Sequence, residues 1–501
     1  MPTVTAPKNP VAPRRGRPAT ELIFGDLWEY DPAPETADPK LKPRYELFIN
    51  GEFVPARSGK YFDSINPANE QKLTELALGG AADVDAAFAA ATRAFAGWSR
   101  LPGRERGKFL FRIARLLQDR AREFAVAETM DNGKPIRETR DFDVPTAAAH
   151  FFYHGGWADK LEYVAPGRRL APLGVVGQVI PWNFPLLMLS WKIAPALAAG
   201  NCVVIKPATN TPVTAVKLAE IFQDAGLPPG VVNVLTGPGS TGGLIMAHPA
   251  AAKIAFTGST EVGKVIMRSV AGTDRRMTME LGGKAANIVF DDAPLDQAVE
   301  GIVNGIFFNQ GQVCCAGSRL LVQETVADLV VAKLKQRLRV LRVGDPLDKN
   351  TDVGAIVSRA QLDTIQRYLD IGQKEGATMW QPPGRLPAKG FFLPPTIFTG
   401  VTQSHCIARE EIFGPVLSIL TFRTLEEAVE KANNTAYGLS AGVWTDKGSR
   451  ILKMSTELKA GVVWANTFNK FDPTSPFGGY KESGFGREGG RQGLLDYAKL
   501  V

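Results

Sequence analysis

Between residues 172 and 282, short apolar runs alternate with amphipathic stretches and turn residues. The runs at 202–205, 231–235 and 253–256 have the length and apolar content of buried strands. After the first run, Thr211-Pro212 marks the N-cap and first turn of a helix, and Gly226-Leu227-Pro228-Pro229 marks its end. This alternation predicts parallel strands joined by crossover helices, which is the order of a nucleotide-binding α/β sheet.

The region before this sheet follows another pattern. From Tyr45, alternating runs around Gly51 and Asn66-Pro67-Ala68 predict strands and turns, and two helices follow. The second helix is predicted to continue until Asn132-Gly133-Lys134-Pro135, because apolar residues recur at helical spacing at Leu110, Ile113, Leu117, Ala121 and Phe124. Residues 1–44, rich in proline and charge, predict an N-terminal arm that is disordered over residues 1–20 and carries an aromatic patch at Phe24, Trp28 and Tyr30.

After residue 282, the segment 286–290 predicts a strand, and a helix from about Leu295 leads to a turn that contains Gly311, Cys314 and Gly317. Such a turn between two apolar segments suits the presentation of a nucleophile. A thiol needs a neighbouring base or positive environment to attack a carbonyl at neutral pH. The segment Met279-Glu280-Leu281-Gly282-Gly283-Lys284 offers a carboxylate. Either segment alone equally fits a small buried cysteine or a solvated glutamate, whereas the pair favours a thiol–carboxylate site.

Length and composition predict a soluble globular enzyme of two or more domains, because 501 residues exceed one typical core. The formal net charge of +7 does not indicate a nucleic-acid partner, since the N-terminal tail supplies over half of it through Lys8, Arg14, Arg15 and Arg17. The apolar tract 170–205 is interrupted by Pro, Asn and Lys residues, which disfavours a membrane span. The first twenty residues have no continuous apolar region of a secretory signal.

Cysteine usage indicates a reducing compartment, and we expect the cytoplasm. The four cysteines are too few for a disulfide framework in a chain of this size, and two of them are adjacent: Cys202, Cys314, Cys315 and Cys406. No metal site is predicted.

Two glycine-containing loops are candidate contacts for a dinucleotide. Gly237-Pro238-Gly239-Ser240-Thr241-Gly242 matches the pattern G-x-G-x-x-G, although it equally suits a plain turn. Gly258 precedes a helix that begins near Ser259, whose backbone N–H groups and dipole suit a pyrophosphate or an ordinary capped helix.

The Cys314 and Glu280 segments, in this order and separation, resemble the NAD(P)-dependent aldehyde dehydrogenases. The resemblance covers most of the chain, from about Tyr45 to Tyr497, and includes the segments Pro181-Trp182-Asn183-Phe184, Phe256-Thr257-Gly258-Ser259-Thr260, Glu411-Ile412-Phe413-Gly414-Pro415 and Ser475-Pro476-Phe477-Gly478-Gly479. It implies an aldehyde-dehydrogenase-like α/β fold with a Rossmann-type cofactor domain, an α/β catalytic domain and a reduced bridging hairpin. The implied ranges are 1–44 for the arm, 45–153 and 172–282 for the cofactor domain, 154–171 and 482–501 for the bridging and oligomerisation segment, and 283–481 for the catalytic domain.

The resemblance also implies a reaction in which an aldehyde is oxidised to a carboxylic acid through a thiohemiacetal and a thioester. Cys314 is the implied nucleophile, and the Asn183 side-chain amide with the Cys314 backbone N–H stabilises the oxyanion. Glu280 is the implied base for the water that hydrolyses the thioester, and its presence favours hydrolysis over transfer to coenzyme A. Lys192 and Glu488 are implied as a proton relay, and either also fits a surface ion pair. Cys315 and Cys202 are interpreted as packing residues.

The implied cofactor is NAD or NADP. Lys206 is expected at the adenosine ribose, Glu411 at the nicotinamide ribose and Phe413 beside the nicotinamide. The other expected cofactor contacts are Ile180, Pro181, Trp182, Thr209, Gly239, Phe256, Gly258, Ser259 and Leu281. An apolar tunnel for the aldehyde is expected between Phe184, Trp191, Phe468 and Phe477, although such aromatics also fit a plain core. Many NAD-preferring members have a glutamate where this chain has Thr209, so strict NAD selectivity is not expected.

Two further departures from the family concern assembly. Residues 161–169 leave room for only a short hairpin, and the chain stops at Val501, before the strand that normally completes the oligomer. We therefore expect a homodimer or a monomer–dimer mixture rather than a stable tetramer. The early end and residues 23–35 also resemble a subfamily in which a second, non-catalytic half follows the first.

Two other functions fit parts of the sequence. A cysteine hydrolase or acyl transferase uses the same nucleophile but needs a histidine base, and none of the four histidines lies in a segment that points to Cys314: His150, His154, His248 and His405. A non-catalytic scaffold is disfavoured by the intact set of Asn183, Glu280 and Cys314.

Overall fold

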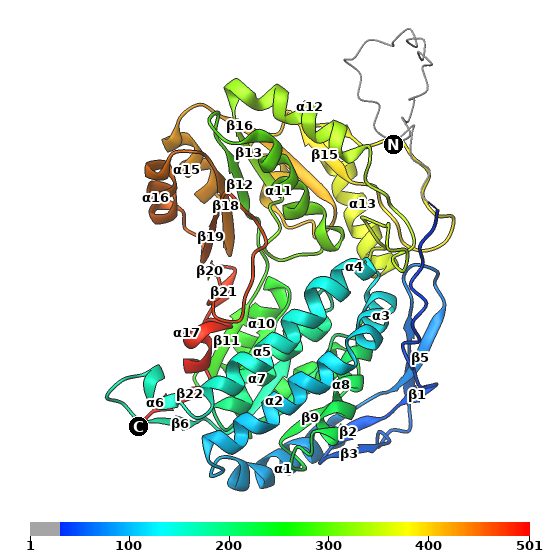
Figure 1. Ribbon diagram of the computed structural model, residues 1–501, viewed down its shortest axis with the longest axis vertical. Helices are drawn as coiled ribbons and strands as arrows, with labels where there is room; N and C mark the ends of the chain where they lie inside the picture. The colour runs from blue at the N-terminus through cyan, green and yellow to red at the C-terminus, as the bar shows by residue number, and fades with distance from the viewer. Residues whose placement is uncertain (1–30) are drawn as a thin grey trace, which may run out of the picture. The chain divides into compact units, whose positions relative to one another are not determined.

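The computed structural model describes residues 31–501 (Figure 1). The predicted disorder of residues 1–20 and the aromatic group Phe24, Trp28 and Tyr30 lie outside this range. Among the described residues, no helix has the length and apolar content needed to cross a membrane.

The larger sheet has the strand order β21-β11-β10-β7-β8-β9-β2-β3. Its central strands run parallel: β7 (Val175–Val179), β8 (Cys202–Lys206), β9 (Val232–Val234), β10 (Ala251–Thr257) and β11 (Arg276–Glu280). Antiparallel strands flank them: β2 (Leu47–Ile49) and β3 (Glu52–Val54) at one edge, and β21 (Gly484–Phe485) at the other. The helices that connect the central strands are α7 (Pro185–Ala198), α8 (Val213–Asp224), α9 (Gly239–Ala247) and α10 (Thr260–Val270). The predicted parallel α/β sheet is thus confirmed.

The second sheet has the order β14-β15-β16-β13-β12-β18-β19. Its strands are β12 (Ala286–Val289), β13 (Arg319–Gln323), β14 (Thr378–Trp380), β15 (Thr396–Thr399), β16 (Val416–Phe422), β18 (Ser440–Trp444) and β19 (Val462–Ala465). Its helices are α11 (Leu295–Phe307), α12 (Ala327–Leu338), α13 (Arg359–Lys374), α14 (Cys406–Arg409), α15 (Leu425–Asn433) and α16 (Gly448–Glu457). One buried apolar cluster extends from the larger sheet into β12, β13 and β16, so the two sheets share a core.

The N-terminal third packs around the larger sheet. A small sheet contains β1 (Arg44–Tyr45), β4 (Tyr61–Ile65) and β5 (Lys72–Ala77). The helices are α1 (Ala81–Trp98), α2 (Gly103–Asp119), α3 (Ala121–Asn132), α4 (Ile136–Glu138) and α5 (Val144–Trp157), with a π-helical segment over Thr139–Asp143. Figure 1 shows α2 and α5 side by side in front of the larger sheet, where they pack on each other and on α7.

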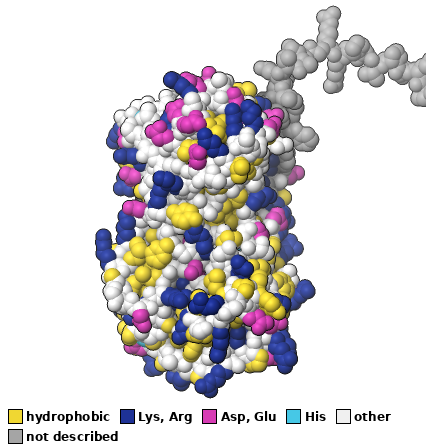
Figure 2. Space-filling model, turned by 90° about the vertical axis from the view of Figure 1, so that its left-hand side faces the viewer, with side chains coloured by type: hydrophobic (Ala, Val, Ile, Leu, Met, Phe, Trp, Pro, Cys, Tyr) yellow, Lys and Arg dark blue, Asp and Glu magenta, His cyan; other side chains and the backbone are white. Residues whose placement is uncertain are grey.

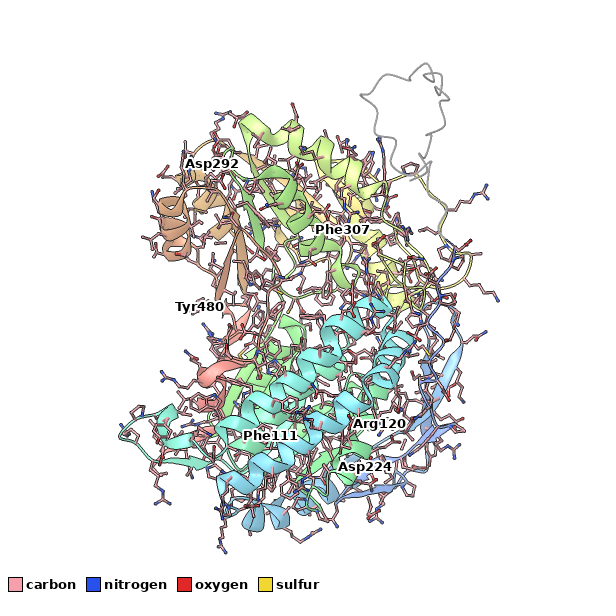
Figure 3. All side chains as sticks on the ribbon, viewed as in Figure 1. Phe111, Arg120, Asp224, Asp292, Phe307 and Tyr480 are labelled. Carbon is pink, nitrogen blue, oxygen red and sulfur yellow. The ribbon has the colours of Figure 1, made fainter. Side chains whose placement is uncertain are left out.

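The helix predicted to run through Ala121 to Asn132 is interrupted, which corrects the sequence prediction. It divides into α2 and α3 at Arg120, whose φ of −100° and ψ of 14° leave the helical region. The guanidinium of Arg120 pairs with Glu123 at 2.6 Å and with Glu220 of α8 at 2.7 Å, and Figure 3 labels Arg120 near Asp224. The apolar spacing continues across the break because both helices bury the same side of the chain, for example at Leu117 and Phe124.

The bridging segment forms a ribbon from two distant parts of the chain. Helix α6 (Leu161–Val164) precedes β6 (Leu170–Pro172), and β6 pairs antiparallel with β22 (Ala498–Leu500) rather than within residues 161–169. The remaining short elements are β17 (Tyr437–Gly438), β20 (Tyr480–Lys481), α17 (Gly490–Leu495) and two 3₁₀ helices over Phe308–Gly311 and Glu324–Val326. Strand β21 lies within the predicted bridging segment 482–501 but pairs with β11 of the larger sheet. Residues 32–501 form one compact unit. The predicted domain boundaries therefore stay a prediction.

Candidate active site

A cavity of about 770 Å³ lies where the carboxyl ends of β7, β8, β10 and β11 meet the turn that carries Cys314. Most of the predicted site residues line it: Ile180, Pro181, Trp182, Asn183, Phe184, Trp191, Lys206, Thr209, Gly239, Phe256, Gly258, Ser259, Leu281, Cys314, Glu411, Phe413 and Phe477. Four do not line it: Lys192, Glu280, Phe468 and Glu488. The structure therefore brings residues from both sheets around one space, as ligand sites at the ends of parallel strands do.

The turn before Cys314 has a strained backbone. Helix α11 ends at Phe307, and Asn309, Gln310 and Gly311 then have φ values of 47°, 54° and 71°. Two consecutive non-glycine residues in this region cost about 1–3 kcal/mol each, so surrounding contacts must hold them. The Gln310 side chain donates to the Ala355 carbonyl at 3.0 Å. A side chain at Gly311 would overlap the backbone of Gly414, so only glycine fits there.

The two adjacent cysteines occupy different environments. Cys314 is partly exposed and lines the cavity, whereas Cys315 is 1% exposed and its sulfur lies 3.8 Å from Oδ1 of Asn469. A hydrogen bond with the Cys315 thiol and burial raise the pKa of the Cys314 thiol well above its usual value. The Cys314 thiol is therefore protonated at neutral pH, and a base would have to remove its proton before it could attack a carbonyl.

Asn183 lies beside this turn and is held by it. Its Nδ2 donates to the Gln312 carbonyl at 2.9 Å, which uses one of the two amide hydrogens. The backbone carbonyl of Asn183 accepts from Nδ2 of Asn309 at 2.7 Å. Asn183 is 3% exposed and lines the cavity, so the second amide hydrogen is available to a ligand.

Glu280 ends β11 and lies behind the cavity wall. Neither carboxyl oxygen has a hydrogen-bond partner among residues 31–501. Burial, followed by the charge of Glu488, raises the pKa of the Glu280 carboxyl well above its usual value. A side chain at Gly478 would come 2.6 Å from the Gly486 carbonyl and 2.9 Å from Oε1 of Glu280, so glycine lets this backbone approach both. Beside it, Lys192 Nζ and Glu488 Oε1 form a buried ion pair at 2.5 Å.

The other end of the cavity fits a dinucleotide. The N-termini of α9 and α10 both line it, and backbone N–H groups at helix N-termini suit a diphosphate. Thr257 lines the cavity, and its hydroxyl is buried without a partner in the described part of the chain. Burial lowers the pKa of the Lys206 ammonium to about 8. Its Nζ donates to the Pro207 carbonyl at 2.7 Å, and the other N–H groups of the ammonium are available to a ligand.

Glu411 and Phe413 are placed by local geometry. Oε1 of Glu411 accepts from the Gly283 N–H at 2.9 Å, and burial raises the pKa of this carboxyl to about 7. A side chain at Gly282 would overlap the Glu411 carboxyl, and one at Gly283 would overlap the Cys314 carbonyl, so each glycine allows one of these close approaches. Phe413 has a φ of 58° and packs edge-on against Trp182 with ring centroids 5.1 Å apart.

The aromatic wall differs from the prediction in one residue. Phe468 packs in the core against Trp464, with ring centroids 4.7 Å apart, and against the backbone of Gly442. Phe471 instead lines the cavity and packs on Phe477 at 5.5 Å. Four apolar residues of this wall were not predicted from the sequence: Phe142, Leu187, Met188 and Phe471. Leu187 and Met188 could have been predicted, because they precede Trp191 by four and three residues on α7 and therefore lie on the same face of that helix.

The Aldehyde dehydrogenase family profile matches residues 53–501. An aldehyde dehydrogenase of Alternaria alternata is 47% identical over 462 residues, which cover 90% of this chain and 93% of that protein. The solved NAD+ complex of aldehyde dehydrogenase from Bacillus cereus has a TM-score of 0.89 and 41% identity, covering 93% of this chain and 99% of that one. P. syringae AldA, an indole-3-acetaldehyde dehydrogenase solved with NAD+ and IAA, also has a TM-score of 0.89 and 41% identity, covering 92% and 96%.

The chain belongs to the aldehyde dehydrogenase family. It is an enzyme that oxidises an aldehyde to a carboxylic acid with NAD or NADP as the hydride acceptor. The resemblance drawn from the Cys314 and Glu280 segments is thereby confirmed, as is the predicted fold class.

Proposed function

We propose that Cys314, Asn183 and Glu280 carry out the oxidation. The observation that supports this is that Cys314 and Asn183 line the same cavity, while Glu280 lies behind its wall and close enough for a charge on Cys314 to raise the Glu280 pKa. Water in the cavity takes the proton of the Cys314 thiol, and the sulfur then adds to the aldehyde carbon as the carbonyl electrons move to the oxygen, which becomes an oxyanion. The second N–H of Asn183 and the Cys314 N–H stabilise this oxyanion, and one such donor contributes about 3 kcal/mol to lowering the barrier. The adduct then gives up a hydride, for which bound NAD(P) would be the acceptor, so the carbon reaches the oxidation level of an acid while it stays bound to sulfur.

Glu280 completes the reaction in this proposal. It takes a proton from the water that attacks the thioester, and the carboxylic acid leaves as the thiol is restored. Its raised pKa makes it a stronger base than an exposed glutamate once it is ionised. The buried Lys192–Glu488 pair, whose charges act on Glu280, then carries the proton away from the site.

We expect the substrate to be an aldehyde with an apolar, preferably aromatic, body. The wall next to Cys314 is formed by Phe142, Phe184, Leu187, Met188, Trp191, Phe471 and Phe477, none of which carries a charge. Phe471 contacts Trp191 and Phe142 edge-on or tilted, so an aromatic ring fits among them. The similar AldA is named for an aldehyde of this class.

The test of the proposed function is the appearance of reduced cofactor when purified protein, NAD and an aldehyde are combined. We expect kcat/KM for phenylacetaldehyde to exceed that for acetaldehyde by about 10–100-fold, because each buried methylene contributes roughly 0.8 kcal/mol. Glyoxylate, which adds a carboxylate, is the matched control and is expected to react poorly. Equal kcat/KM for all three aldehydes contradicts the substrate class, and no reduced cofactor with any aldehyde contradicts the activity.

NADP is expected to be used at a substantial fraction of the NAD rate. Thr209 lines the cavity and donates to the Gly237 carbonyl at 3.0 Å, so this position presents no negative charge to a 2′-phosphate. Thr209→Glu is expected to lower kcat/KM for NADP at least about tenfold and to leave NAD within about threefold. A wild-type preference for NAD of roughly a thousandfold, about 4 kcal/mol, requires another repulsive group and contradicts the proposal.

The protein is expected to form a homodimer or a monomer–dimer mixture. The contact is expected to use exposed faces of the helices that connect the strands of the larger sheet. The exposed large apolar residues of α9 and α10 are Leu244, Val262 and Val265. Figure 2 shows further hydrophobic side chains grouped on the face that carries the β6–β22 ribbon. Strand β22 pairs with β6 of its own chain, so one edge of β22 cannot pair with a strand of a second subunit.

Light scattering at micromolar concentration tests this assembly. Val265→Asp, at a position that is 61% exposed, is expected to shift the protein toward the 54.1 kDa monomer. Leu452→Asp on α16, at a position that is 68% exposed, is the control and is expected to leave the dimer unchanged. A single tetrameric species of the wild-type protein overturns the proposal.

A cytoplasmic location is part of the proposal, and four unpaired cysteines support it. Cell fractionation tests it. A cysteine hydrolase remains disfavoured, because no histidine of residues 31–501 lines the cavity.

A further inference from the structure

A cluster of buried ionisable side chains lies outside the cavity wall, between α3 and α5. Its members are Glu128, Lys134, Glu138 and Asp143, and none is more than 6% exposed. Lys134 Nζ pairs with Oδ2 of Asp143 at 2.7 Å. Three carboxyl groups thus share one ammonium, and burial raises the pKa values of Glu128 and Glu138 to about 8. Two of the acids are therefore neutral at pH 7, and burying them costs stability unless they make specific bonds.

Each acid that is not paired with Lys134 bonds to a segment of the active site. Oε2 of Glu128 accepts from the Leu186 N–H at 3.2 Å, which satisfies a free amide in the first turn of α7, three residues after Asn183. Oε2 of Glu138 accepts from the Asn309 N–H at 2.9 Å. The Lys134 ammonium lies 4.1 Å from the centroid of Phe184. The cluster thus contacts the chain on both sides of the oxyanion site.

Asn309 connects this cluster to Asn183. Its Nδ2 donates to the Asn183 carbonyl at 2.7 Å and to the Gln312 carbonyl at 3.3 Å. The same Gln312 carbonyl accepts from Nδ2 of Asn183, so two side chains meet at one backbone carbonyl two residues before Cys314. Asn309 has a φ of 47°, a conformation that persists only when surrounding bonds hold it. Glu138 supplies the bond to its backbone N–H.

We infer that Glu138 is a positioning residue for aldehyde oxidation, which fixes the Asn309 turn so that the Asn183 amide and the Cys314 N–H point at the same oxygen. Glu138 lies 171 positions before Asn309 and contacts neither the cavity nor the nucleophile, so it acts through the turn. The inference rests on the proposed role of Asn183. It adds a residue of the N-terminal helices to the machinery of the reaction.

Glu138→Leu and Glu138→Gln separate positioning from packing. Leucine removes the acceptor, whereas glutamine keeps an oxygen for the Asn309 N–H and matches a neutral acid in shape. We expect Glu138→Leu to lower kcat about 10–100-fold, because a small displacement of a catalytic group costs that much, and to leave the KM for NAD within about twofold. Glu138→Gln is expected to keep kcat within about threefold of wild type. All rates are counted per Cys314 that iodoacetamide can alkylate, so unfolded protein does not enter kcat.

Asp131→Leu is the matched control. Asp131 is a buried carboxyl on α3 that bonds to Ser64 at 2.5 Å and to the Val213 N–H at 2.9 Å, rather than to Leu186 or Asn309. Its loss is expected to lower the melting temperature and to leave kcat per alkylatable site unchanged. If Asp131→Leu lowers kcat as much as Glu138→Leu does, or if Glu138→Gln fails to restore kcat, the inference is overturned.

A second variant covers the case in which Glu138→Leu does not fold. Asn309→Gly tolerates the positive φ and removes only the side-chain bonds to Asn183 and Gln312. It is expected to lower kcat like Glu138→Leu, and unchanged kcat overturns the inference. Asn183→Ala is measured beside it. If Asn183→Ala lowers kcat and Asn309→Gly does not, only the positioning role falls; if Asn183→Ala has no effect, the oxyanion assignment falls and the inference with it.

Discussion

Cys314→Ala is expected to lower kcat for aldehyde oxidation by about 10⁴-fold or more, while Cys315→Ala retains activity within about threefold. Removal of a catalytic nucleophile has effects of this size, because no other group forms the covalent intermediate. The two residues are adjacent and chemically identical, so the comparison isolates position. Cys314 is partly exposed at the cavity, whereas Cys315 is 1% exposed and directs its sulfur toward Asn469.

The measurement is initial-rate formation of reduced cofactor with saturating NAD and phenylacetaldehyde. Thermal unfolding of both variants shows whether a lost rate reflects a lost fold. Cys315→Ala is expected to lower stability by about 1 kcal/mol, since it replaces a buried thiol by a smaller group. Wild-type kcat in Cys314→Ala, or equal loss in both variants, excludes Cys314 as the sole nucleophile.

The strands of the larger sheet were predictable because their local pattern and their burial agree. Residues 202–205 are apolar and β8 is buried at every position. The same holds for β10, which is buried at six of its seven residues. The turn with Cys314 was predictable from its glycines. The structure gives the reason for one of them, because a side chain at Gly311 would overlap the backbone of Gly414. These features depend on residues close together in sequence.

Features that depend on distant contacts were not predictable. The pairing of β6 with β22 joins Leu170 to Leu500, and no local pattern in either strand identifies its partner. Phe468 and Phe471 lie in one loop, and only the packing of Phe471 against Phe477 decides which ring lines the cavity. The bond between Glu138 and Asn309 spans 171 positions. The chemical groups of the candidate site could therefore be predicted from the sequence, whereas the residues that hold them in place could not.

Glu280→Gln is expected to leave the first turnover fast and to slow the steady state by about 10²–10³-fold, the usual contribution of a general base. The amide keeps the shape of the side chain but cannot take a proton from water. The Cys314 sulfur still adds to the aldehyde and transfers its hydride once, so reduced cofactor appears as a burst equal to the number of active sites. The thioester then accumulates.

Rapid-mixing absorbance of the reduced cofactor measures the burst, and mass spectrometry of the quenched protein detects the acyl group on Cys314. Glu488→Gln is the control, because it perturbs the Lys192 pair at 2.5 Å without removing the proposed base, and it is expected to slow the steady state less than Glu280→Gln. A variant Glu280→Gln with no burst and unchanged turnover places the base elsewhere.

The dependence of kcat on pH tests the role of Glu280 independently. Burial and the charge of Glu488 raise the pKa of Glu280, so the carboxyl is protonated and inactive as a base below that raised value. Wild-type kcat is therefore expected to rise with pH as Glu280 ionises, and the rise is expected to disappear in Glu280→Gln. Hydroxylamine, a nucleophile that attacks thioesters without a general base, is expected to restore turnover of Glu280→Gln by releasing the acyl group as a hydroxamate. If hydroxylamine leaves the slow rate unchanged, hydrolysis is not the step that Glu280 assists.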